Sequence, residues 1–372
     1  MENIASGYQS RPLLVFWETT KACDLTCRHC RATSMKLPAE DELTLDQSMD
    51  FLNQLTEFNG KPPVLIMTGG DVMKKQNLAE IMHHARDLKI PFALSPAVTG
   101  LGNEGSFSLV EGSGASSISI SLDGKEGFHD YLRGIGVFQK TIRTLRALKE
   151  SGINIQVNTL VSGNNLMDLP WVLKILLELG IKTWEIFFLI KVGRGMDVED
   201  VTSEQYDAAC KFLVYAAGYG INIRTVEGPY FRKLSIDHNN DVSLGNNRLF
   251  SELKETAVKL CGHPEHGKDR IPVAKTSDGN GIIFVSHNGR VRPSGFLPLD
   301  VGNILDKRLV EVYEKSEILK RMRDRSNITG KCGACQYLEV CGGSRARAYF
   351  YRGEVFAEDP VCPLQLNQGD SI

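Results

Sequence analysis

Residues 17–34 read Trp17-Glu18-Thr19-Thr20-Lys21-Ala22-Cys23-Asp24-Leu25-Thr26-Cys27-Arg28-His29-Cys30-Arg31-Ala32-Thr33-Ser34 and place three thiols at the spacing C-x3-C-x2-C. The apolar run 13–17 is typical of a β-strand, and the polar residues after it break that pattern, so we expect the cysteines on a loop that follows a buried strand. Structural zinc sites are closed by four ligands, and a cubane iron–sulfur cluster also normally takes four thiolates. Three cysteine ligands therefore leave one metal position open for a substrate or cofactor. The alternative is a reduced thiol cluster that holds zinc or no metal.

Length and composition limit the class of protein. The 372 residues suffice for one barrel of about 200–250 residues and a smaller domain. The net charge of -2 favours neither nucleic acid nor an anionic membrane surface as a partner. Residues 1–7 lack the basic flank and apolar core of a signal peptide, and no run of about 18 apolar residues occurs, so we expect a cytoplasmic protein. In that reducing compartment the 9 cysteines are expected to be metal ligands, catalytic groups or buried residues, with Cys210 in the core.

Short β-rich runs alternate with helical runs from residue 13 to about residue 225, which is typical of βα units with a parallel sheet. The expected strands are 13–17, 63–67, 91–94, 116–120, 153–158 and 184–189. The expected helices are about 44–57, 75–88, 103–111, 137–150, 166–179 and 203–219. Strands this short favour a curled, incomplete barrel, although periodicity alone does not separate it from a flat doubly wound sheet. In either fold we expect the chemistry at the carboxyl ends of the strands.

Candidate ligand-binding residues follow two of these strands. After the second comes Thr68-Gly69-Gly70-Asp71, where the glycines let the backbone approach a ligand and the acid can accept hydrogen bonds from an ammonium group. The fourth strand ends with Ser121 and Asp123, whose hydroxyl and carboxylate can contact polar groups of a ligand. The alternatives are a plain βα turn for the glycines, and helix capping or turn formation for Ser121 and Asp123.

A second group of cysteines lies near the carboxyl end of the chain. It consists of Cys332, Cys335, Cys341 and Cys362, with the first three at the spacing C-x2-C-x5-C. Four thiolates can close a metal site completely, so such a site is structural or carries electrons. A zinc ribbon is the alternative, because four cysteines that include a C-x2-C pair also describe one.

The first cysteine motif resembles that of the radical S-adenosylmethionine (SAM) enzymes. In that family three thiolates hold a [4Fe–4S] cluster whose fourth iron is chelated by SAM, and one electron then splits SAM into methionine and a 5′-deoxyadenosyl radical. The resemblance implies that Cys23, Cys27 and Cys30 are the cluster ligands, and that the fold is a partial (β/α)6 TIM-like barrel. His29 stands where most members have an aromatic residue.

The same resemblance implies which residues contact SAM or the substrate. Most members have Gly-Gly-Glu-Pro where this chain has Gly69-Gly70-Asp71-Val72, so the acid is one methylene shorter and the proline is missing. The stretch Ser121-Leu122-Asp123-Gly124 and the later Arg133-Gly134 resemble SPASM-type members. Arg133 could pair with the SAM carboxylate. The implied contacts are Gly69, Gly70, Asp71, Ser121, Asp123, Arg133, Asn158 and Arg194.

The carboxyl-terminal cysteines resemble the SPASM or twitch extension, which binds auxiliary [4Fe–4S] clusters. A second auxiliary cluster would need cysteines where this chain has Ser294 and Arg345, so we predict one auxiliary cluster, held by Cys332, Cys335, Cys341 and Cys362. In a minor variant, Cys261, His263 and His266 supply mixed ligands for a second site. We expect a barrel domain over residues 1–235 and a cysteine-rich domain over 236–372. The segment 228–250 changes character, and within it we expect loop structure at 237–241 and 245–247.

Within the family, the stretches 284–298 and 341–348 resemble the branch that contains the iron-coproporphyrin decarboxylase, heme d1 relatives and a tungsten-cofactor modifying protein. This implies hydrogen-atom abstraction in cofactor maturation, with oxidative decarboxylation of tetrapyrrole propionates as the first expectation. Four arginines could pair with propionates or lie on the solvated surface, namely Arg290, Arg292, Arg345 and Arg347.

Two alternatives stay open for the function. A maturase acting on a ribosomal precursor peptide is the closer one, although we expect no spare amino-terminal domain to bind such a peptide. A non-enzymatic iron–sulfur or zinc protein is the alternative of another class. For the enzyme, the expected partners are a tetrapyrrole or peptide substrate and an electron donor such as ferredoxin or flavodoxin.

Overall fold

The computed structural model describes residues 8–102, 104–267 and 269–364, which form two compact units. Unit 1 contains the described residues of 1–120, 133–155 and 275–324, and unit 2 contains those of 121–132, 156–274 and 325–372. Each unit is therefore built from stretches that lie far apart in the sequence. The boundary expected near residue 235 falls inside helix α8 (Tyr230–Asn239) of unit 2, and the functional division at that point stays a prediction.

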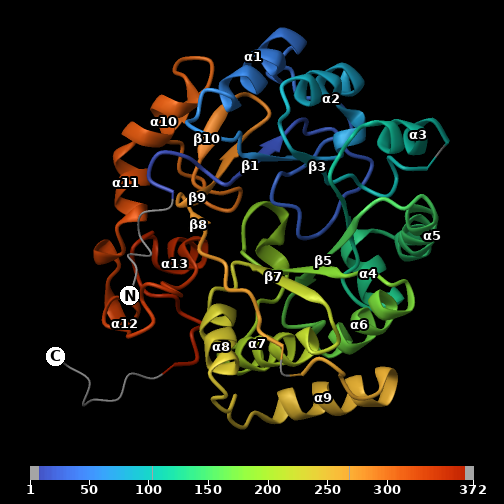
Figure 1. Cartoon of the computed structure of the whole chain (residues 1–372), viewed down its shortest axis with the longest axis vertical. Helices are drawn as coiled ribbons and strands as arrows, with labels where there is room; N and C mark the ends of the chain where they lie inside the picture. Colours follow the sequence, from blue (N-terminus) through green and yellow to red (C-terminus); the bar gives the residue numbers. More distant parts are fainter. Residues whose placement is uncertain (1–7, 103, 268, 365–372) are drawn as a thin grey trace. The chain divides into compact units, whose positions relative to one another are not determined.

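Unit 1 is organised around strand β1, which lies inside a mostly parallel sheet (Figure 1). Its strands are β1 (Leu14–Glu18), β2 (Val64–Thr68), β3 (Phe92–Leu94), β4 (Ile118–Ser121), β8 (Ser277–Asp278), β9 (Gly281–Val285), β10 (Arg290–Arg292) and β11 (Gly302–Asn303). Their order is β11-β10-β9-β1-β2-β3-β4, with β8 beside β9 and with β10 antiparallel to both neighbours. Strand β1 pairs in parallel with β2 and β9, and Val15 and Trp17 within it are fully buried. The loop with the first three cysteines leaves the carboxyl end of β1, as the sequence predicts.

Helices cover this sheet. They are α1 (Leu45–Leu55), the short η2 (Val72–Lys74), α2 (Leu78–Asp87), α3 (Glu104–Gly112), α5 (Val137–Glu150), α10 (Leu309–Lys315) and α11 (Glu317–Arg323). Helix α1 begins at a capping box, in which Thr44 and Gln47 satisfy each other's backbone N–H groups. Its buried face includes Phe51, whose ring packs edge-on at 5.1 Å from Trp17 of β1.

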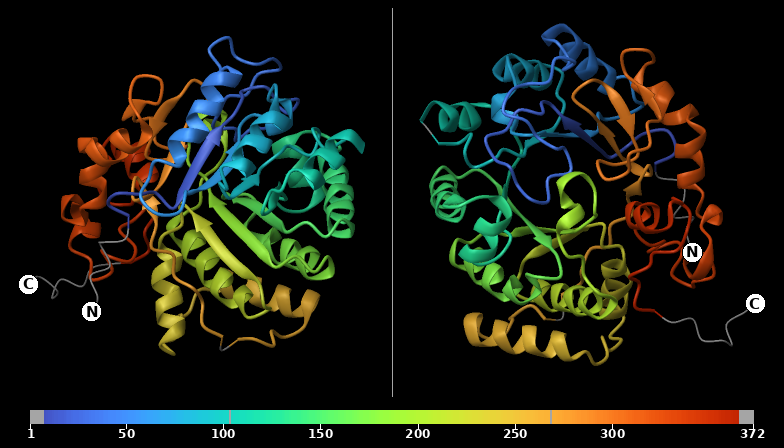
Figure 2. Two further views of the ribbon diagram at one scale, coloured as in Figure 1. Left: turned by 45° about the horizontal axis from the view of Figure 1, so that its top comes forward. Right: turned by 180° about the vertical axis from the view of Figure 1, so that it is seen from behind.

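Unit 2 contains a three-stranded parallel sheet, β5 (Ile155–Val161), β6 (Thr183–Phe188) and β7 (Asn222–Val226). Its helices are α4 (Glu126–Arg133), η3 (Leu166–Asp168), α6 (Leu169–Glu178), η4 (Gly193–Asp197), α7 (Ser203–Ala217), α8, α9 (Arg248–Cys261), η5 (Arg325–Asn327), α12 (Gly330–Gly333) and α13 (Arg345–Arg352). Alternate residues of β6 are buried, and the Phe188 ring lies 4.8 Å from the Tyr206 ring of α7. One face of the sheet is thus covered by helices (Figure 2). Cys210 of α7 is fully buried, which confirms its expected place in the core.

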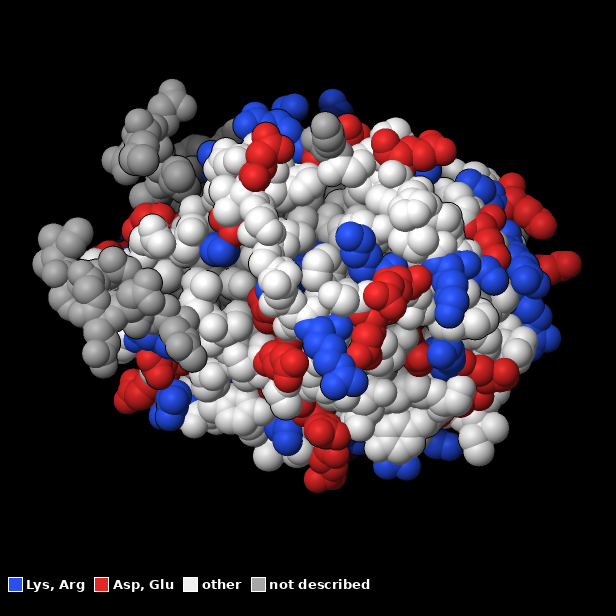
Figure 3. Space-filling model, turned by 90° about the horizontal axis from the view of Figure 1, so that it is seen from below, with Lys and Arg blue, Asp and Glu red and all other residues white. Residues whose placement is uncertain are grey.

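The loop expected at 245–247 is confirmed, because these residues lie between α8 and α9, whereas residues 237–239 of the loop expected at 237–241 form the end of α8. Tyr230, Phe231 and Leu234 bury one face of α8, and tertiary packing outweighs the polar composition of its last turn. Helix α9 packs against α6 and α7 at the lower edge of unit 2 in Figure 1. Figure 3 shows the molecule from this side, with acidic and basic side chains interspersed.

The predicted α/β class and the six predicted strands are confirmed, because each predicted range overlaps one of β1 to β6. Strand β7, helix α4 and the strands after residue 275 were not predicted. Within the described residues, no helix is both long and apolar enough to cross a membrane.

Candidate functional site

The first cysteine loop, residues 23–30, is held by backbone hydrogen bonds rather than by regular structure. Cys23 N donates to Met35 O at 2.7 Å, and Met35 N donates to Lys21 O at 2.9 Å. Within the loop, Cys30 N donates to Cys27 O at 3.2 Å. This pairing closes the base of the three-thiol loop next to the end of β1, which limits how far the cysteines can separate.

The thiols of this loop lie close enough to interact electrostatically. The pKa of the Cys23 thiol is raised to about 11, mainly by burial and to a smaller extent by negative charge on Asp71, Cys27 and Cys30, although the Leu25 N–H, 3.4 Å from Cys23 Sγ, acts against this. A thiol with a raised pKa stays protonated near neutral pH unless a cation stabilises its thiolate. The donor set therefore fits a metal centre that binds thiolates, as iron does. Among the described residues, no group of three or more His, Cys, Asp and Glu side chains is arranged to hold a single metal ion.

The two glycines after β2 serve the packing of this loop. A Cβ atom on Gly70 would lie 2.4 Å from the Ala22 carbonyl oxygen, and one on Gly69 would lie 2.6 Å from the Thr20 carbonyl oxygen. The glycine N–H of residue 70 donates to that Thr20 oxygen at 2.7 Å. The close approach that the sequence predicts is thus made to the chain's own backbone beside Cys23, and their contact with SAM stays a prediction.

Asp71 is the chemically notable residue beside the loop. Its Oδ1 accepts from the N–H groups of Met73 and Ala97 at 3.1 and 3.2 Å, while its buried Oδ2 has no hydrogen-bond partner among the described residues. Burial raises the pKa of this carboxyl to about 6, although those hydrogen bonds and Lys74 act in the opposite direction. An orphaned carboxylate oxygen suits an ammonium group, but Gly100 packs directly against Oδ2.

A charged network that the sequence did not reveal anchors the same loop to the strands after residue 275. Arg31, next to Cys30, forms an ion pair with Glu18 at 3.1 Å and lies 4.4 Å from the Phe284 ring centroid. His287 Nδ1 lies 2.9 Å from the other Glu18 oxygen, and its Nε2 lies 3.3 Å from Asp41. Burial would raise the pKa of Glu18, but His287 and Arg31 together hold it below its usual range. The sequence feature that could have identified Glu18 is an acidic residue at the end of an apolar strand.

In unit 2, Asp123 is engaged within the fold. Its Oδ1 accepts from Leu160 N at 2.8 Å, and its backbone N–H donates to His129 Nδ1 at 3.2 Å. Its backbone oxygen accepts from Asn165 Nδ2 at 2.6 Å. Asp123 therefore ties the residues after β4 to β5 and α4, and its contact with SAM stays a prediction. Ser121 is half-buried at the end of β4.

The eight expected SAM contacts are divided between the units. Gly69, Gly70, Asp71 and Arg133 belong to unit 1, while Ser121, Asp123, Asn158 and Arg194 belong to unit 2. Asn158 is half-buried on β5, where its Oδ1 accepts from Gln156 Nε2 at 2.9 Å. Arg133 ends α4 and Arg194 lies on η4, and both are half-buried. Their roles as ligand contacts stay predictions.

The second cysteine group, Cys332, Cys335, Cys341 and Cys362, forms a four-thiol region within unit 2. Backbone N–H groups point at its sulfur atoms, since Asp359 N lies 3.3 Å from Cys332 Sγ and Tyr337 N lies 3.4 Å from Cys335 Sγ. Burial raises the pKa of Cys341 to about 12 and that of Cys362 to about 11, and negative charge on the neighbouring thiols and Asp359 contributes. N–H donors aimed at sulfur suit an iron–sulfur cluster.

Guanidinium groups surround the four-thiol region. Burial and the neighbouring charges of Arg232 and Arg345 lower the pKa of Arg325 to about 10, whereas Cys341 acts in the opposite direction. Arg345 NH1 donates to the carbonyl oxygens of Val355 and Ala357 at 2.9 and 2.7 Å. Crowded cations of this kind favour an anionic group, and a cluster with four thiolate ligands is one.

The four arginines considered as propionate partners are all engaged inside their own unit. Arg290 and Arg292 both pair with Asp300, at 2.8 and 2.6 Å. Arg345 is buried on backbone carbonyls, and the fully buried Arg347 lies 3.7 Å from Asp200 and 3.5 Å from Asp359. Their spacing in the sequence gave no sign of this burial, and the structure does not favour them as ligands of a substrate.

Cys261 ends α9, where burial raises the pKa of its thiol and the charged groups that act on it belong to α6. Helix α9 lies at the opposite side of unit 2 from α12 and α13 in Figures 1 and 2. His266 pairs with Asp269 at 3.3 Å, and His263 is exposed. The minor variant with a mixed Cys and His site therefore gains no support.

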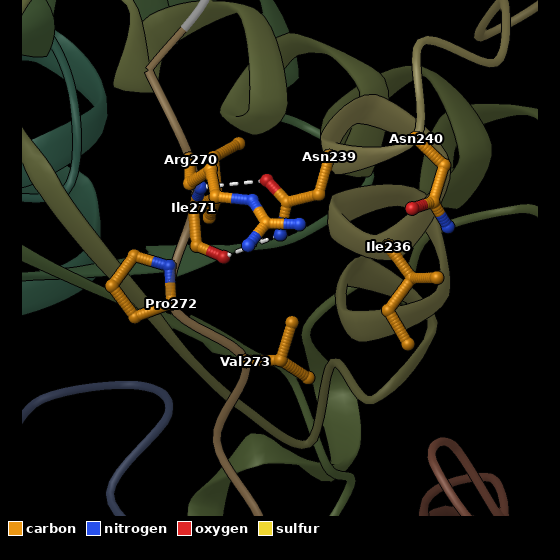
Figure 4. A pocket seen from close by; sticks show the side chains of 7 residues that line it. All are labelled: Ile236, Asn239, Asn240, Arg270, Ile271, Pro272 and Val273. Atoms are coloured by element: carbon orange, nitrogen blue, oxygen red, sulfur yellow. Dashed lines mark hydrogen bonds between the residues drawn. The ribbon is translucent and has the colours of Figure 1, made fainter.

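A cavity of about 410 Å³ opens between α8 and residues 270–273 (Figure 4). Asn239 closes one side of it by exchanging hydrogen bonds with the backbone of Ile271, at 2.9 and 2.8 Å. Its lining contains none of the cysteines and none of the expected SAM contacts. We therefore do not place the chemistry there.

Comparison with known proteins agrees with the cysteine pattern. The model of the Radical SAM superfamily matches residues 17–176. The chain is 31% identical over 358 residues to the AdoMet-dependent heme synthase of Oleidesulfovibrio alaskensis, covering 95% of this chain and 87% of that protein. It is 27% identical to the pre-heme d1 synthase of Dinoroseobacter shibae, over 94% and 86%. It is 26% identical to the mycofactocin maturase MftC of Mycolicibacterium smegmatis, over 94% and 82%.

Solved structures support the fold. The crystal structure of Streptococcus suis SuiB bound to S-adenosylmethionine matches with a TM-score of 0.67 at 15% sequence identity, over 95% of this chain and 78% of that chain. This confirms the predicted fold class, a radical SAM barrel with a cysteine-rich SPASM-type extension. The chain therefore belongs to the radical SAM superfamily, in the branch that contains the AdoMet-dependent heme synthases.

Proposed function

We propose that this radical SAM enzyme acts in cofactor maturation and decarboxylates the propionate side chains of an iron-coproporphyrin oxidatively. The observation that supports the substrate class is the likeness to AdoMet-dependent heme synthases along 95% of the chain, with two sets of thiols in place. A three-thiol loop leaves a metal position open for SAM, and a four-thiol region does not.

Each set of residues has its own role in the proposed reaction. Cys23, Cys27 and Cys30 would hold the [4Fe–4S] cluster, which together with SAM supplies a 5′-deoxyadenosyl radical for hydrogen abstraction. Glu18, through Arg31 and His287, fixes the loop next to β1. The residues Cys332, Cys335, Cys341 and Cys362 would hold one auxiliary cluster, which supplies an electron acceptor for an oxidative reaction. An external one-electron donor, such as ferredoxin or flavodoxin, completes the proposal.

A peptide maturase is the second candidate, and the likeness to mycofactocin maturases along 94% of the chain favours it. The identity is lower than with the heme synthases, 26% against 31%. The two functions separate by substrate, since a peptide maturase must change the mass of a precursor peptide and a heme-type enzyme must remove carboxylates from a porphyrin.

The test uses protein purified without oxygen, reduced with dithionite and mixed with SAM and iron-coproporphyrin III. We expect 5′-deoxyadenosine, carbon dioxide and a porphyrin that has lost carboxylates, all detected by chromatography and mass spectrometry. Cys27→Ala serves as the inactive control. Formation of 5′-deoxyadenosine with an unchanged porphyrin would refute the substrate, and intact SAM with zinc in place of iron would refute the enzyme.

A further inference from the structure

Asp359 is the residue at which three of the four thiol segments meet. Its backbone N–H lies 3.3 Å from Cys332 Sγ, and its backbone oxygen accepts from Cys362 N at 3.3 Å. Its side chain accepts from Ser344 N at 2.9 Å, and Ser344 lies three residues after Cys341. Only 1% of Asp359 is exposed to solvent. One buried residue thus orders the backbone around three of the expected cluster ligands.

Gly343 makes this close packing possible. It has a φ of 67°, and a Cβ atom on it would lie 3.0 Å from Cys332 Sγ and 2.8 Å from Asp359 Cβ. A side chain at this position would therefore push the Asp359 segment away from the sulfur atom. Reduction adds negative charge to an iron–sulfur cluster, and an N–H group that donates to a cluster sulfur stabilises that charge. The N–H of Asp359 would thus raise the reduction potential.

The carboxylate of Asp359 acts against its own N–H. Burial is the main cause of the raised pKa of the Cys332, Cys341 and Cys362 thiols, and the negative charge of Asp359 also raises the pKa of each. The carboxylate charge therefore acts on the sulfur atoms of these three residues. Without a balancing cation, it would disfavour the electron that a reduced cluster gains.

Arg347 of α13 supplies the balancing cation. It is fully buried, its Nη1 lies 3.5 Å from Asp359 Oδ2, and the same Nη1 donates to Glu227 O at 3.3 Å. Its Nε lies 3.7 Å from Asp200 Oδ2, and among the described residues neither Nε nor Nη2 has a hydrogen-bond partner. A buried guanidinium with two unmade hydrogen bonds is costly. Further negative charge nearby would offset that cost, and a cluster with four thiolate ligands is anionic.

We propose that Asp359 and Arg347 are positioning residues that together set the reduction potential of the cluster on the four thiols. Asp359 aims its N–H at Cys332, and Arg347 offsets the carboxylate charge that this arrangement brings next to the sulfur atoms. This inference rests on the proposed function, because it takes the four thiols to hold the auxiliary cluster that accepts an electron. A higher reduction potential makes that cluster a better electron acceptor.

The experiment is a redox titration followed by electron paramagnetic resonance, on a Cys27→Ala parent in which only the four-thiol cluster is titrated. We expect Arg347→Met to lower the ratio of reduced to oxidised cluster at a fixed potential by about 10-fold, or about 59 mV for one electron, because the reduced state loses a buried cation. Asp359→Asn should raise that ratio by a similar factor, because it removes a negative charge and keeps the backbone N–H. Arg347→Lys, which keeps the charge, should stay within about twofold of the parent, as should Arg352→Met, which removes a half-exposed arginine from the end of α13.

Opposite shifts in Arg347→Met and Asp359→Asn support the inference, because a merely structural disturbance of the N–H contact would lower the potential in both variants. Shifts in the same direction, or no shift in either variant, would overturn it. If Arg347→Met does not fold, a raised potential in Asp359→Asn supports the inference, and a lowered or unchanged potential there overturns it.

The same proteins separate this inference from the proposed function. Zinc in place of iron in the parent would refute the auxiliary cluster, and the inference with it. Opposite shifts of the potential, together with a porphyrin that keeps all its carboxylates when the enzyme with Cys27 intact is reduced and given SAM, would refute the proposed substrate alone.

Discussion

The three-thiol loop and the four-thiol region both bring several thiols together, and they differ in how much charge is buried beside those thiols. Beside the loop, the fixing charges are partly exposed, since the side chains of Arg31, His287 and Asp41 are 20%, 13% and 61% accessible. Beside the four-thiol region, Arg347 is fully buried and the paired Asp359 is 2% accessible. Burial of an unpaired charge is costly, so the second arrangement has to stay intact. A site that must admit SAM can be held less rigidly by its surroundings than a site that four thiols close completely.

Among the variants that test this comparison, Cys27→Ala should have the largest effect. We expect SAM cleavage to be abolished, because two thiolates do not hold a cluster with one open iron. The iron content should fall from about eight to about four per chain, since the four-thiol region lies apart in the sequence and keeps its own cluster. Iron and sulfide assays with chromatography of 5′-deoxyadenosine measure both effects. Loss of all iron would mean that the two sites do not load independently.

Cys335→Ala should give the converse result. We expect iron to fall by a similar amount, while some 5′-deoxyadenosine still forms without the matching product, because the three-thiol loop is unchanged. The ratio of 5′-deoxyadenosine to decarboxylated porphyrin measures this uncoupling. Wild-type coupling in this variant would remove the four-thiol region from the reaction.

Arg347→Met tests the buried charges. The substitution leaves Asp200 and Asp359 without their buried cation and removes a guanidinium 5.2 Å from the Tyr206 ring, so we expect a loss of about 3–5 kcal/mol in unfolding free energy. Urea denaturation of the cluster-loaded protein measures it. Arg352→Met, which removes a half-exposed arginine at the end of the same helix, is the control and should cost less than about 1 kcal/mol. Equal effects would show that burial does not distinguish the two positions.

The carboxyl groups of Glu18 and Glu185 should affect stability differently as the pH changes. Glu18 has two partners, Arg31 and His287, and a lowered pKa, whereas Glu185 has one exposed arginine nearby and a pKa raised to about 7. Ionisation of Glu185 is therefore disfavoured in the folded state. The folded protein loses stability from this group as the pH rises from about 4.5 to about 7. At pH 8 we expect Glu185→Gln to be more stable than the wild type by up to about 3 kcal/mol, at 1.36 kcal/mol per pKa unit, and at pH 4 to be equal. A difference that does not vary with pH between these values would contradict the titration.

The sequence predicted the parts of this fold that follow from local patterns. Alternating apolar runs located β1 to β6, and the cysteine spacing separated the two thiol sets. Long-range pairing was not predictable, because nothing local to 281–285 indicates a parallel partner at β1. For the same reason the alignment of Asn158, Glu185 and Arg224 was missed, since only the register of three strands brings them together. The burial of Arg345 and Arg347 was missed because charged residues are expected on the surface.

The smallest expected effect comes from His287→Leu, beside the three-thiol loop. The substitution removes the 2.9 Å contact with Glu18 and leaves Arg31 as its cationic partner, so we expect a loss of about 1–3 kcal/mol at pH 7. The pKa of Glu18 is lowered in the folded state, so its stabilisation is present above about pH 4.5 and is lost as the pH falls. The variant should therefore differ less from the wild type at pH 3 than at pH 7. Asp41→Asn, at the exposed end of the network, should cost less than about 1 kcal/mol. If His287→Leu cost as much as Arg347→Met, the loop would be as rigidly held as the four-thiol region, and the contrast between an open and a closed site would have to rest on the number of thiols alone.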